Sequence, residues 1–166
     1  GHRAVSLTPG GQQLIVTVLL PLDAQLQAVN TTEQYVEDTV AHYEPMRVRL
    51  MTEAPGAPRA TQFLHVLQGA DSGVTPIETT LVQSDDGAWQ GAAVNGVVAL
   101  FPQALPQTLT TLTYLAPADT RLHLITGLTP GAGYAVTVEV VGDGLRVTVQ
   151  PGAQLTADTG GVLVVK

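Results

Sequence analysis

Turn-forming clusters of Gly, Pro, Asn and Asp interrupt this chain about every 8–12 residues, a spacing typical of β-sandwiches and β-barrels. The clusters include Pro55-Gly56, Asn95-Gly96, Pro130-Gly131 and Gly142-Asp143-Gly144. The runs between them are short and rich in Val, Leu and Thr, residues that favour pleated, half-buried strands. The pattern predicts an all-β fold, a two-layer antiparallel β-sandwich of about 10–13 strands with little or no helix.

Two hairpins are predicted most clearly. In the run 134–140, alternate residues share one face, and the alternation resumes after the turn at Gly142-Asp143-Gly144. Period-2 patterning on both sides of an Asp-Gly turn is a strong hairpin signal. Asn95-Gly96 predicts a second hairpin between residues 90–94 and 97–101. The residues expected to face inward in the first hairpin are Tyr134, Val136, Val138, Val140, Leu145, Val147 and Val149.

Two other runs, Leu14–Leu20 and Gln62–Leu67, are apolar at nearly every position. Strands of this kind are expected in the middle of a sheet with both faces covered. They therefore suggest that a neighbouring structure packs on the outer face of at least one sheet. Residues 31–43 contain weak helix formers in a poor stripe, and we interpret them as irregular strand and loop.

The chain has no cysteine, which excludes disulfides and thiolate metal sites. Its net charge of −7 and the lack of a basic stripe argue against a nucleic-acid partner. No run of about 18 apolar residues predicts a membrane span, and the N-terminus does not have the pattern of a signal peptide. We interpret Gly1-His2 as the remnant of a tag and residues 3–166 as a single domain, a piece of a larger multidomain protein.

No constellation of catalytic or metal-binding residues is apparent. His2, His42, His65 and His123 are widely spaced, so we expect no metal site and no cofactor. We expect His65 to lie in the core or between sheets, bonded to a backbone carbonyl, and His123 to point outward between Leu122 and Leu124. No Gly-x-Ser-x-Gly elbow is present. Asp85-Asp86 before Gly87 predicts an exposed turn, with a calcium loop as the weaker alternative.

A sugar-binding role would need an exposed aromatic side chain, and Trp89 is the candidate that the sequence offers. Trp89 follows the Asp85-Asp86-Gly87 turn, where it could lie near a sheet edge. The alternative, that Trp89 packs in the core, is favoured because large aromatic residues are mostly buried. Tyr114 and Tyr134 are both predicted to face inward.

Three segments of the chain form a familiar succession: Leu-Ile-Val-Thr-Val-Leu-Leu-Pro-Leu-Asp-Ala (14–24), then residues 46–51, then Thr-Gln-Phe-Leu-His-Val-Leu (61–67). Together they resemble the C-terminal β-sandwich domain of the heparinase II/III-like polysaccharide lyases. Residues 94–101 and 128–134 are similar to later strands of that domain, so the likeness spans about residues 3–165. In that family the Asn, His and Tyr groups of the elimination reaction lie upstream, and none can be assigned to this chain.

The resemblance implies a non-catalytic accessory domain that packs against and stabilises the catalytic domains of a carbohydrate-active bacterial protein. Such a protein would be secreted or periplasmic. Its expected partners are the neighbouring domains and a polysaccharide, with no nucleic acid and no membrane. A carbohydrate-binding module is the first alternative. The second is a fibronectin-like interaction module, suggested by Leu128-Thr-Pro-Gly-Ala-Gly-Tyr134, which looks like the tyrosine corner of such domains.

Overall fold

The computed structural model describes residues 3–7, 10–30, 48–105 and 108–166, and the described residues form fourteen β-strands and no helix. The predicted all-β class is confirmed, with one strand more than the predicted range. Residues 31–43, predicted to be irregular, lie outside the described residues, as do His2 and His42.

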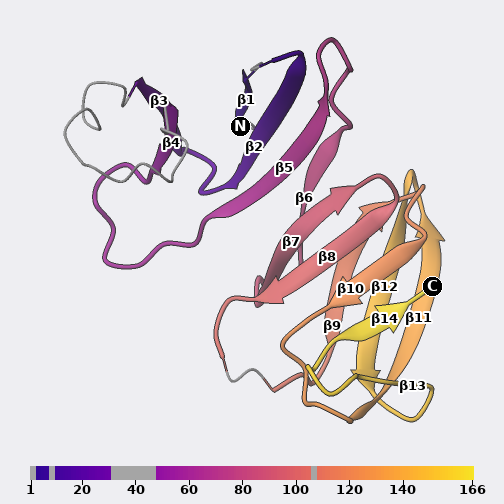
Figure 1. The fold of residues 1–166 in the computed structure, drawn as a ribbon. Helices are drawn as coiled ribbons and strands as arrows, with labels where there is room; N and C mark the ends of the chain where they lie inside the picture. The colour runs from indigo at the N-terminus through magenta and orange to yellow at the C-terminus, as the bar shows by residue number, and fades with distance from the viewer. Residues whose placement is uncertain (1–2, 8–9, 31–47, 106–107) are drawn as a thin grey trace.

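The sandwich itself is formed by residues 79–165 (Figure 1). One layer has five strands in the order β14-β10-β8-β7-β6, and the other has four in the order β13-β11-β12-β9. All neighbours are antiparallel except β8 and β10, which are parallel. The five-stranded sheet contains β6 (Thr79–Gln83), β7 (Trp89–Val94), β8 (Val97–Pro102), β10 (Leu122–Ile125) and β14 (Leu163–Val165). The four-stranded sheet contains β9 (Leu112–Pro117), β11 (Gly133–Val141), β12 (Gly144–Pro151) and β13 (Leu155–Thr156).

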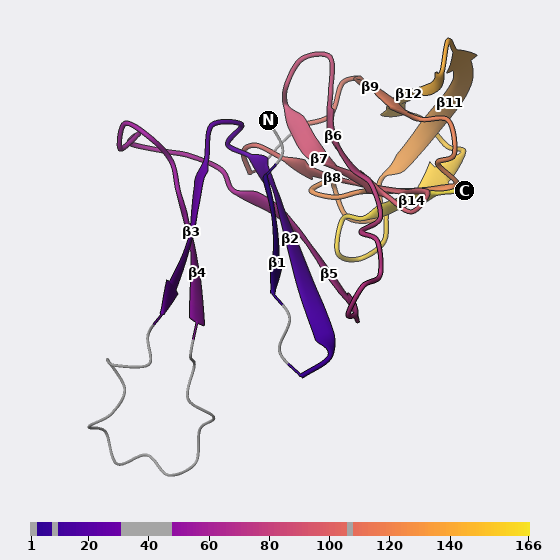
Figure 2. The ribbon, with the colours of Figure 1, turned by 90° about the horizontal axis from the view of Figure 1, so that it is seen from above.

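The first half of the chain adds two smaller sheets beside the sandwich. β1 (Arg3–Leu7), β2 (Gln12–Leu20) and β5 (Leu64–Asp71) form an antiparallel sheet in the order β1-β2-β5. β3 (Gln25–Asn30) and β4 (Val48–Glu53) form a separate antiparallel pair. In both ribbon views the three-stranded sheet lies between this pair and the sandwich (Figures 1 and 2).

The hydrophobic core lies between the two layers of the sandwich. Alternate residues on each strand point inward, which follows from the two-residue period of a β-strand. Burying these aliphatic and aromatic side chains supplies the main driving force for folding. The inward residues with almost no exposed surface are Trp89, Val98, Leu100, Leu112, Tyr114, Ile125, Val147, Val149 and Leu163.

Both predicted hairpins are confirmed. β7 and β8 are joined by Asn95 and Gly96, with φ angles of 51° and 74°. Two successive positive φ values are what a type I′ turn requires, and Asn-Gly adopts them most readily. β11 and β12 pair from Tyr134 opposite Pro151 to Val141 opposite Gly144. Tyr134, Val147 and Val149 are buried as predicted, but Val138 and Val140, which were also expected to face inward, are 47% and 80% exposed.

The predicted tyrosine corner is also present. Tyr134 is buried at the start of β11, and its hydroxyl accepts a hydrogen bond from the Thr129 backbone N–H at 3.3 Å. This contact ties the loop before β11 to the core, as in other sandwiches that use the device. It accounts for the Leu-x-Pro-x-x-x-Tyr pattern as a packing feature.

The two continuous apolar runs have different outcomes. β2 is the middle strand of its sheet, and residues Ile15–Leu19 are buried on both faces, as predicted. The expectation for Gln62–Leu67 was wrong because β5 is an edge strand, and Leu67 is 62% exposed. An apolar run therefore marked a central strand in one case and an edge strand in the other.

Candidate binding surfaces

Trp89 is a core residue and only 1% exposed. Its indole Nε1–H donates to the Thr126 carbonyl at 3.1 Å, and its backbone N–H donates to Ser84 Oγ at 2.9 Å. These bonds close the turn before β7 and hold the ring between the two sheets. The structure matches the core interpretation of Trp89 and does not support the sugar-binding one, since no ring face is open to a ligand.

His123 is buried, and the expectation that it points outward was wrong. It lies on the inner face of β10, where Nδ1 is 2.9 Å from the Tyr114 hydroxyl of β9. Burial lowers the pKa of His123 and raises that of Tyr114, because the core disfavours both charged forms. Each side chain therefore supplies the other with a polar partner inside an otherwise apolar core.

Acidification is expected to weaken the fold through His123. Its pKa in the folded chain is below the ordinary value of 6.5, so the unfolded chain takes up the proton first as the pH falls. The contribution of neutral His123 to the free energy of unfolding is therefore complete above about pH 6.5. It is lost as the pH falls from there through the pKa of His123 in the folded chain. Urea unfolding measured at a series of pH values between about 7.5 and about 5 should show this loss.

His123→Asn tests whether His123 causes the loss of stability on acidification, because an amide can keep a polar partner for Tyr114 and does not titrate. It should flatten the pH dependence in that window. An unchanged slope in His123→Asn would contradict the assignment.

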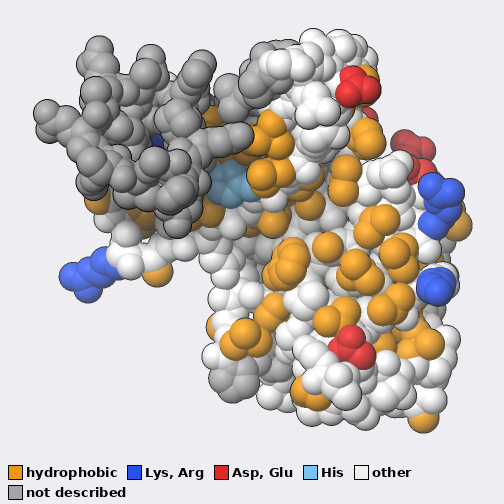
Figure 3. Space-filling model, in the orientation of Figure 1, with side chains coloured by type: hydrophobic (Ala, Val, Ile, Leu, Met, Phe, Trp, Pro, Cys, Tyr) orange, Lys and Arg blue, Asp and Glu red, His pale blue; other side chains and the backbone are white. Residues whose placement is uncertain are grey.

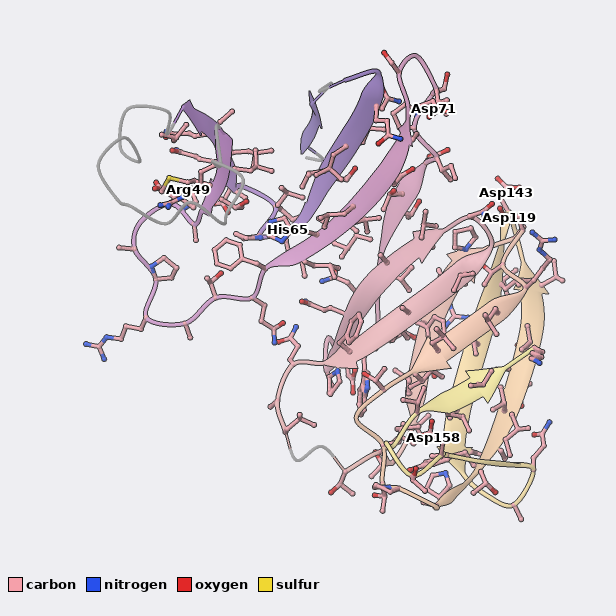
Figure 4. All side chains as sticks on the ribbon, in the orientation of Figure 1. Arg49, His65, Asp71, Asp119, Asp143 and Asp158 are labelled. Atoms are coloured by element: carbon pink, nitrogen blue, oxygen red, sulfur yellow. The ribbon has the colours of Figure 1, made fainter. Side chains whose placement is uncertain are left out.

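His65 lies at the start of β5, near the β3–β4 pair (Figure 4). Its ring is half-buried, and Nε2 is 3.0 Å from the Thr52 hydroxyl of β4, in place of the backbone carbonyl that the sequence led us to expect. The ring also stacks on Phe63, with centroids 6.1 Å apart and planes inclined by 13°. His65 thus connects β4 to the aromatic residue that precedes β5.

The acidic residues serve turns and a surface ion pair. Asp86 accepts hydrogen bonds from Ser84 Oγ at 2.6 Å and from the Ala88 N–H at 3.0 Å, and the Ser84 bond lowers its pKa. Asp85 pairs with Arg146 at 3.2 Å. Among the described residues no group of three or more His, Asp or Glu side chains could hold a metal ion. Figure 4 shows Asp71 and Asp158 at opposite ends of the molecule.

The outer face of the five-stranded sheet is apolar, which is unusual for a sandwich. On β8, outward Val97, Ala99 and Phe101 alternate with buried Val98 and Leu100. The register places neighbouring strands' apolar residues beside them, and Figure 3 shows hydrophobic side chains gathered over these strands. We define the apolar face by six of the outward residues, Val94, Val97, Ala99, Leu122, Leu124 and Val164.

The outer face of the four-stranded sheet is polar by comparison. Thr113 and Thr148 are cross-strand neighbours with hydroxyls 3.4 Å apart, and Glu139 lies opposite Arg146. The large apolar side chains of this face are Leu115 and Val141, which are 50% and 44% exposed. One sheet thus has the polar exterior expected of a solvated sandwich, and the other has a second apolar surface.

A groove runs between the three-stranded sheet and the end of β8. Two adjoining hollows, of about 240 and 590 Å³, share Leu20, Gln62 and Gln90 in their walls. Phe63 and Leu64 line the first from the β5 side, and Phe101 and Pro102 line it from β8. The second is completed by Pro21, Ala60, Thr61 and Gln103. We call this the Gln–Phe groove.

Comparison of the chain with models of protein families and with curated proteins found no match. Among the described residues there is no helix that is long and apolar enough to cross a membrane. The groove was missed in the sequence because Phe63, just before β5, and Phe101, on β8, are far apart in the chain, and neither residue has a local motif around it.

Proposed function

We propose that this chain is a non-catalytic accessory domain that stabilises a larger protein by packing the apolar face against a neighbouring domain. The parent that we propose is a heparinase II/III-like polysaccharide lyase of a bacterium, secreted or periplasmic. That assignment depends on the resemblance of residues 14–24 and 61–67 to the family's C-terminal sandwich.

The observation that carries the packing role is the contrast between the two outer faces. Apolar side chains that remain in water are unfavourable in proportion to their area, and contiguous exposed apolar patches are uncommon on monomeric proteins. Each residue of the apolar face is uncharged, and the face spans four adjacent strands of one rigid sheet. A flat surface of this kind suits a covering domain better than a small ligand.

The packing role predicts a position-dependent effect of one substitution, Leu to Gln. Leu124→Gln alters the apolar face and Leu115→Gln alters the polar face of the other sheet. In the encoded polypeptide that contains the flanking domains, Leu124→Gln should lower the unfolding temperature by several degrees more than it does in the isolated chain, because a buried amide lacks a partner there. Leu115→Gln should change the unfolding temperatures of the isolated chain and of the longer polypeptide by the same small amount.

Thermal unfolding of the wild type and the two variants, each as the isolated chain and as the longer polypeptide, gives the result. Equal effects of Leu124→Gln in the isolated chain and in the longer polypeptide would contradict the packing role, as would a polypeptide in which no domain flanks this chain. The non-catalytic part of the proposal is tested by incubating the isolated chain with uronate-containing polysaccharides. Release of the unsaturated uronate, followed by its ultraviolet absorbance, would overturn it.

A further inference from the structure

The Gln–Phe groove combines exposed aromatic rings with neutral amide side chains. Phe63 is 45% exposed and Phe101 is 48% exposed, and both line the same hollow. Exposed phenylalanine is unfavourable in water, so two such rings in one groove indicate a surface that gains from being covered. Phe63 directly precedes β5 and Phe101 lies on β8, so the two rings line the hollow from different parts of the fold.

The Phe63 ring is held in position before any ligand arrives. Its orientation is fixed by the stacking contact with His65, and His65 is fixed in turn by the 3.0 Å contact with Thr52. Pre-organised aromatic platforms lose little conformational entropy on binding. Thr52 and His65 are therefore positioning residues for the wall that Phe63 forms.

Three amide side chains supply the polar part of the groove. Gln62 and Gln90 line both hollows, and Gln103 lines the larger one. The Gln62 side-chain amide donates to the backbone carbonyl of Gln103 at 2.9 Å, which joins the two walls and holds the Gln62 side chain in place. Amides can donate and accept hydrogen bonds at once, as a ligand with many hydroxyl groups requires.

Among the residues that the structure describes, the walls of both hollows contain no Asp, Glu, Lys, Arg or His. A sulfated or carboxylated ligand would find no cation to pair with there, and the chain as a whole carries a net charge of −7. The combination of stacking rings, amides and no charge selects a neutral, polyhydroxylated ligand. The larger hollow, about 590 Å³, lies within the usual range for ligand pockets.

We propose that the Gln–Phe groove binds a neutral oligosaccharide, with Phe63 and Phe101 stacking on sugar rings and Gln62 and Gln90 bonding to hydroxyl groups. The site goes beyond the packing role and is tested separately from it, because the isolated chain contains the whole groove. The groove borders the apolar face, since Gln90 and Phe101 lie on the same outer side of the five-stranded sheet as Val97 and Ala99. It also differs from the site at Trp89 that the sequence suggested.

Calorimetric titration of the isolated chain tests the site with cello-, xylo-, manno- and malto-oligosaccharides, and with heparin oligosaccharides as the acidic contrast. We expect saturable binding of at least one neutral series and none of heparin. Phe101→Ala should weaken that binding by about tenfold or more, as truncation of a central aromatic contact does. Leu115→Ala, another exposed position, should bind like the wild type.

His65→Asn provides a second variant that leaves every groove side chain in place. If His65 positions Phe63, this variant should weaken binding without changing the number of sites. Circular dichroism must show each variant folded. The site is overturned if no neutral series binds to folded protein, if heparin binds as well as they do, or if Phe101→Ala binds with unchanged affinity. None of these results bears on the packing role, which is measured in the longer polypeptide.

Discussion

Gly91→Ala is expected to destabilise the sandwich by about 4 kcal/mol or more, in the range that marks a severe core defect. A Cβ atom at Gly91 would overlap the Ala99 carbonyl oxygen and lie 2.9 Å from Leu100 Cα. Both neighbours are backbone atoms of β8, so no side-chain rotation can relieve the clash. The neighbouring strands β7 and β8 would have to separate or shift, which would disturb the inward positions of Trp89 and Leu100.

Gly69→Ala is the matched control for this change. Gly69 is also a strand glycine, on β5, but a Cβ atom there has no neighbour within 4 Å and its φ is not positive. The same added methyl group should therefore leave stability unchanged or raise it slightly, because alanine reduces the freedom of the unfolded chain. Chemical denaturation followed by circular dichroism compares the two. Similar midpoints for both variants would contradict the close approach of β7 and β8.

Trp89→Ala should cost about 3–5 kcal/mol, the range found when a large aromatic residue is removed from a packed core. The substitution opens a cavity between the sheets and removes the donor to the Thr126 carbonyl. Trp89→Phe keeps most of the volume but not this bond, so we expect a loss of about 1–3 kcal/mol. Denaturation monitored by circular dichroism measures both losses, since the chain has a single tryptophan and the variants lack its fluorescence.

Phe101→Ala is the contrasting truncation, on the neighbouring strand and at a half-exposed position. It should reduce stability far less than Trp89→Ala does. In the wild type, the emission of Trp89 should be that of a buried indole and should not shift when an oligosaccharide is added. A red, exposed-type emission from folded protein, or a Trp89→Ala variant as stable as the wild type, would show that the ring is not in the core.

The local elements could be predicted because short-range chemistry determines them. Asn95-Gly96 predicted its hairpin since few other pairs accept two positive φ angles, and Gly142-Asp143-Gly144 did so between runs with clear alternation. The tyrosine corner at Tyr134 is local as well, since its partner Thr129 is only five residues away. In each case the residues that define the feature are close together in the sequence.

The wrong predictions concern positions where contacts with residues far away in the sequence decide which face of a strand points inward. Leu122 and Leu124 are more hydrophobic than His123, so alternation alone placed the histidine outside. Its inward position depends on the Tyr114 hydroxyl of β9 and on the apolar outer face, which leaves both leucines on the exterior. The parallel pairing of β8 with β10 and the Gln–Phe groove are non-local in the same way, since neither has a signal within one segment.

Side-chain footprinting in the longer polypeptide is the most direct test of whether the apolar face packs against a neighbouring domain. A carbene label would be applied to the isolated chain and to the encoded polypeptide with its flanking domains, and labelling compared at Leu122, Leu124 and Val164. We expect strong protection of these residues in the longer polypeptide, and unchanged labelling of Leu115 on the opposite sheet. Equal labelling of the apolar face in the two samples, with both folded, would contradict it.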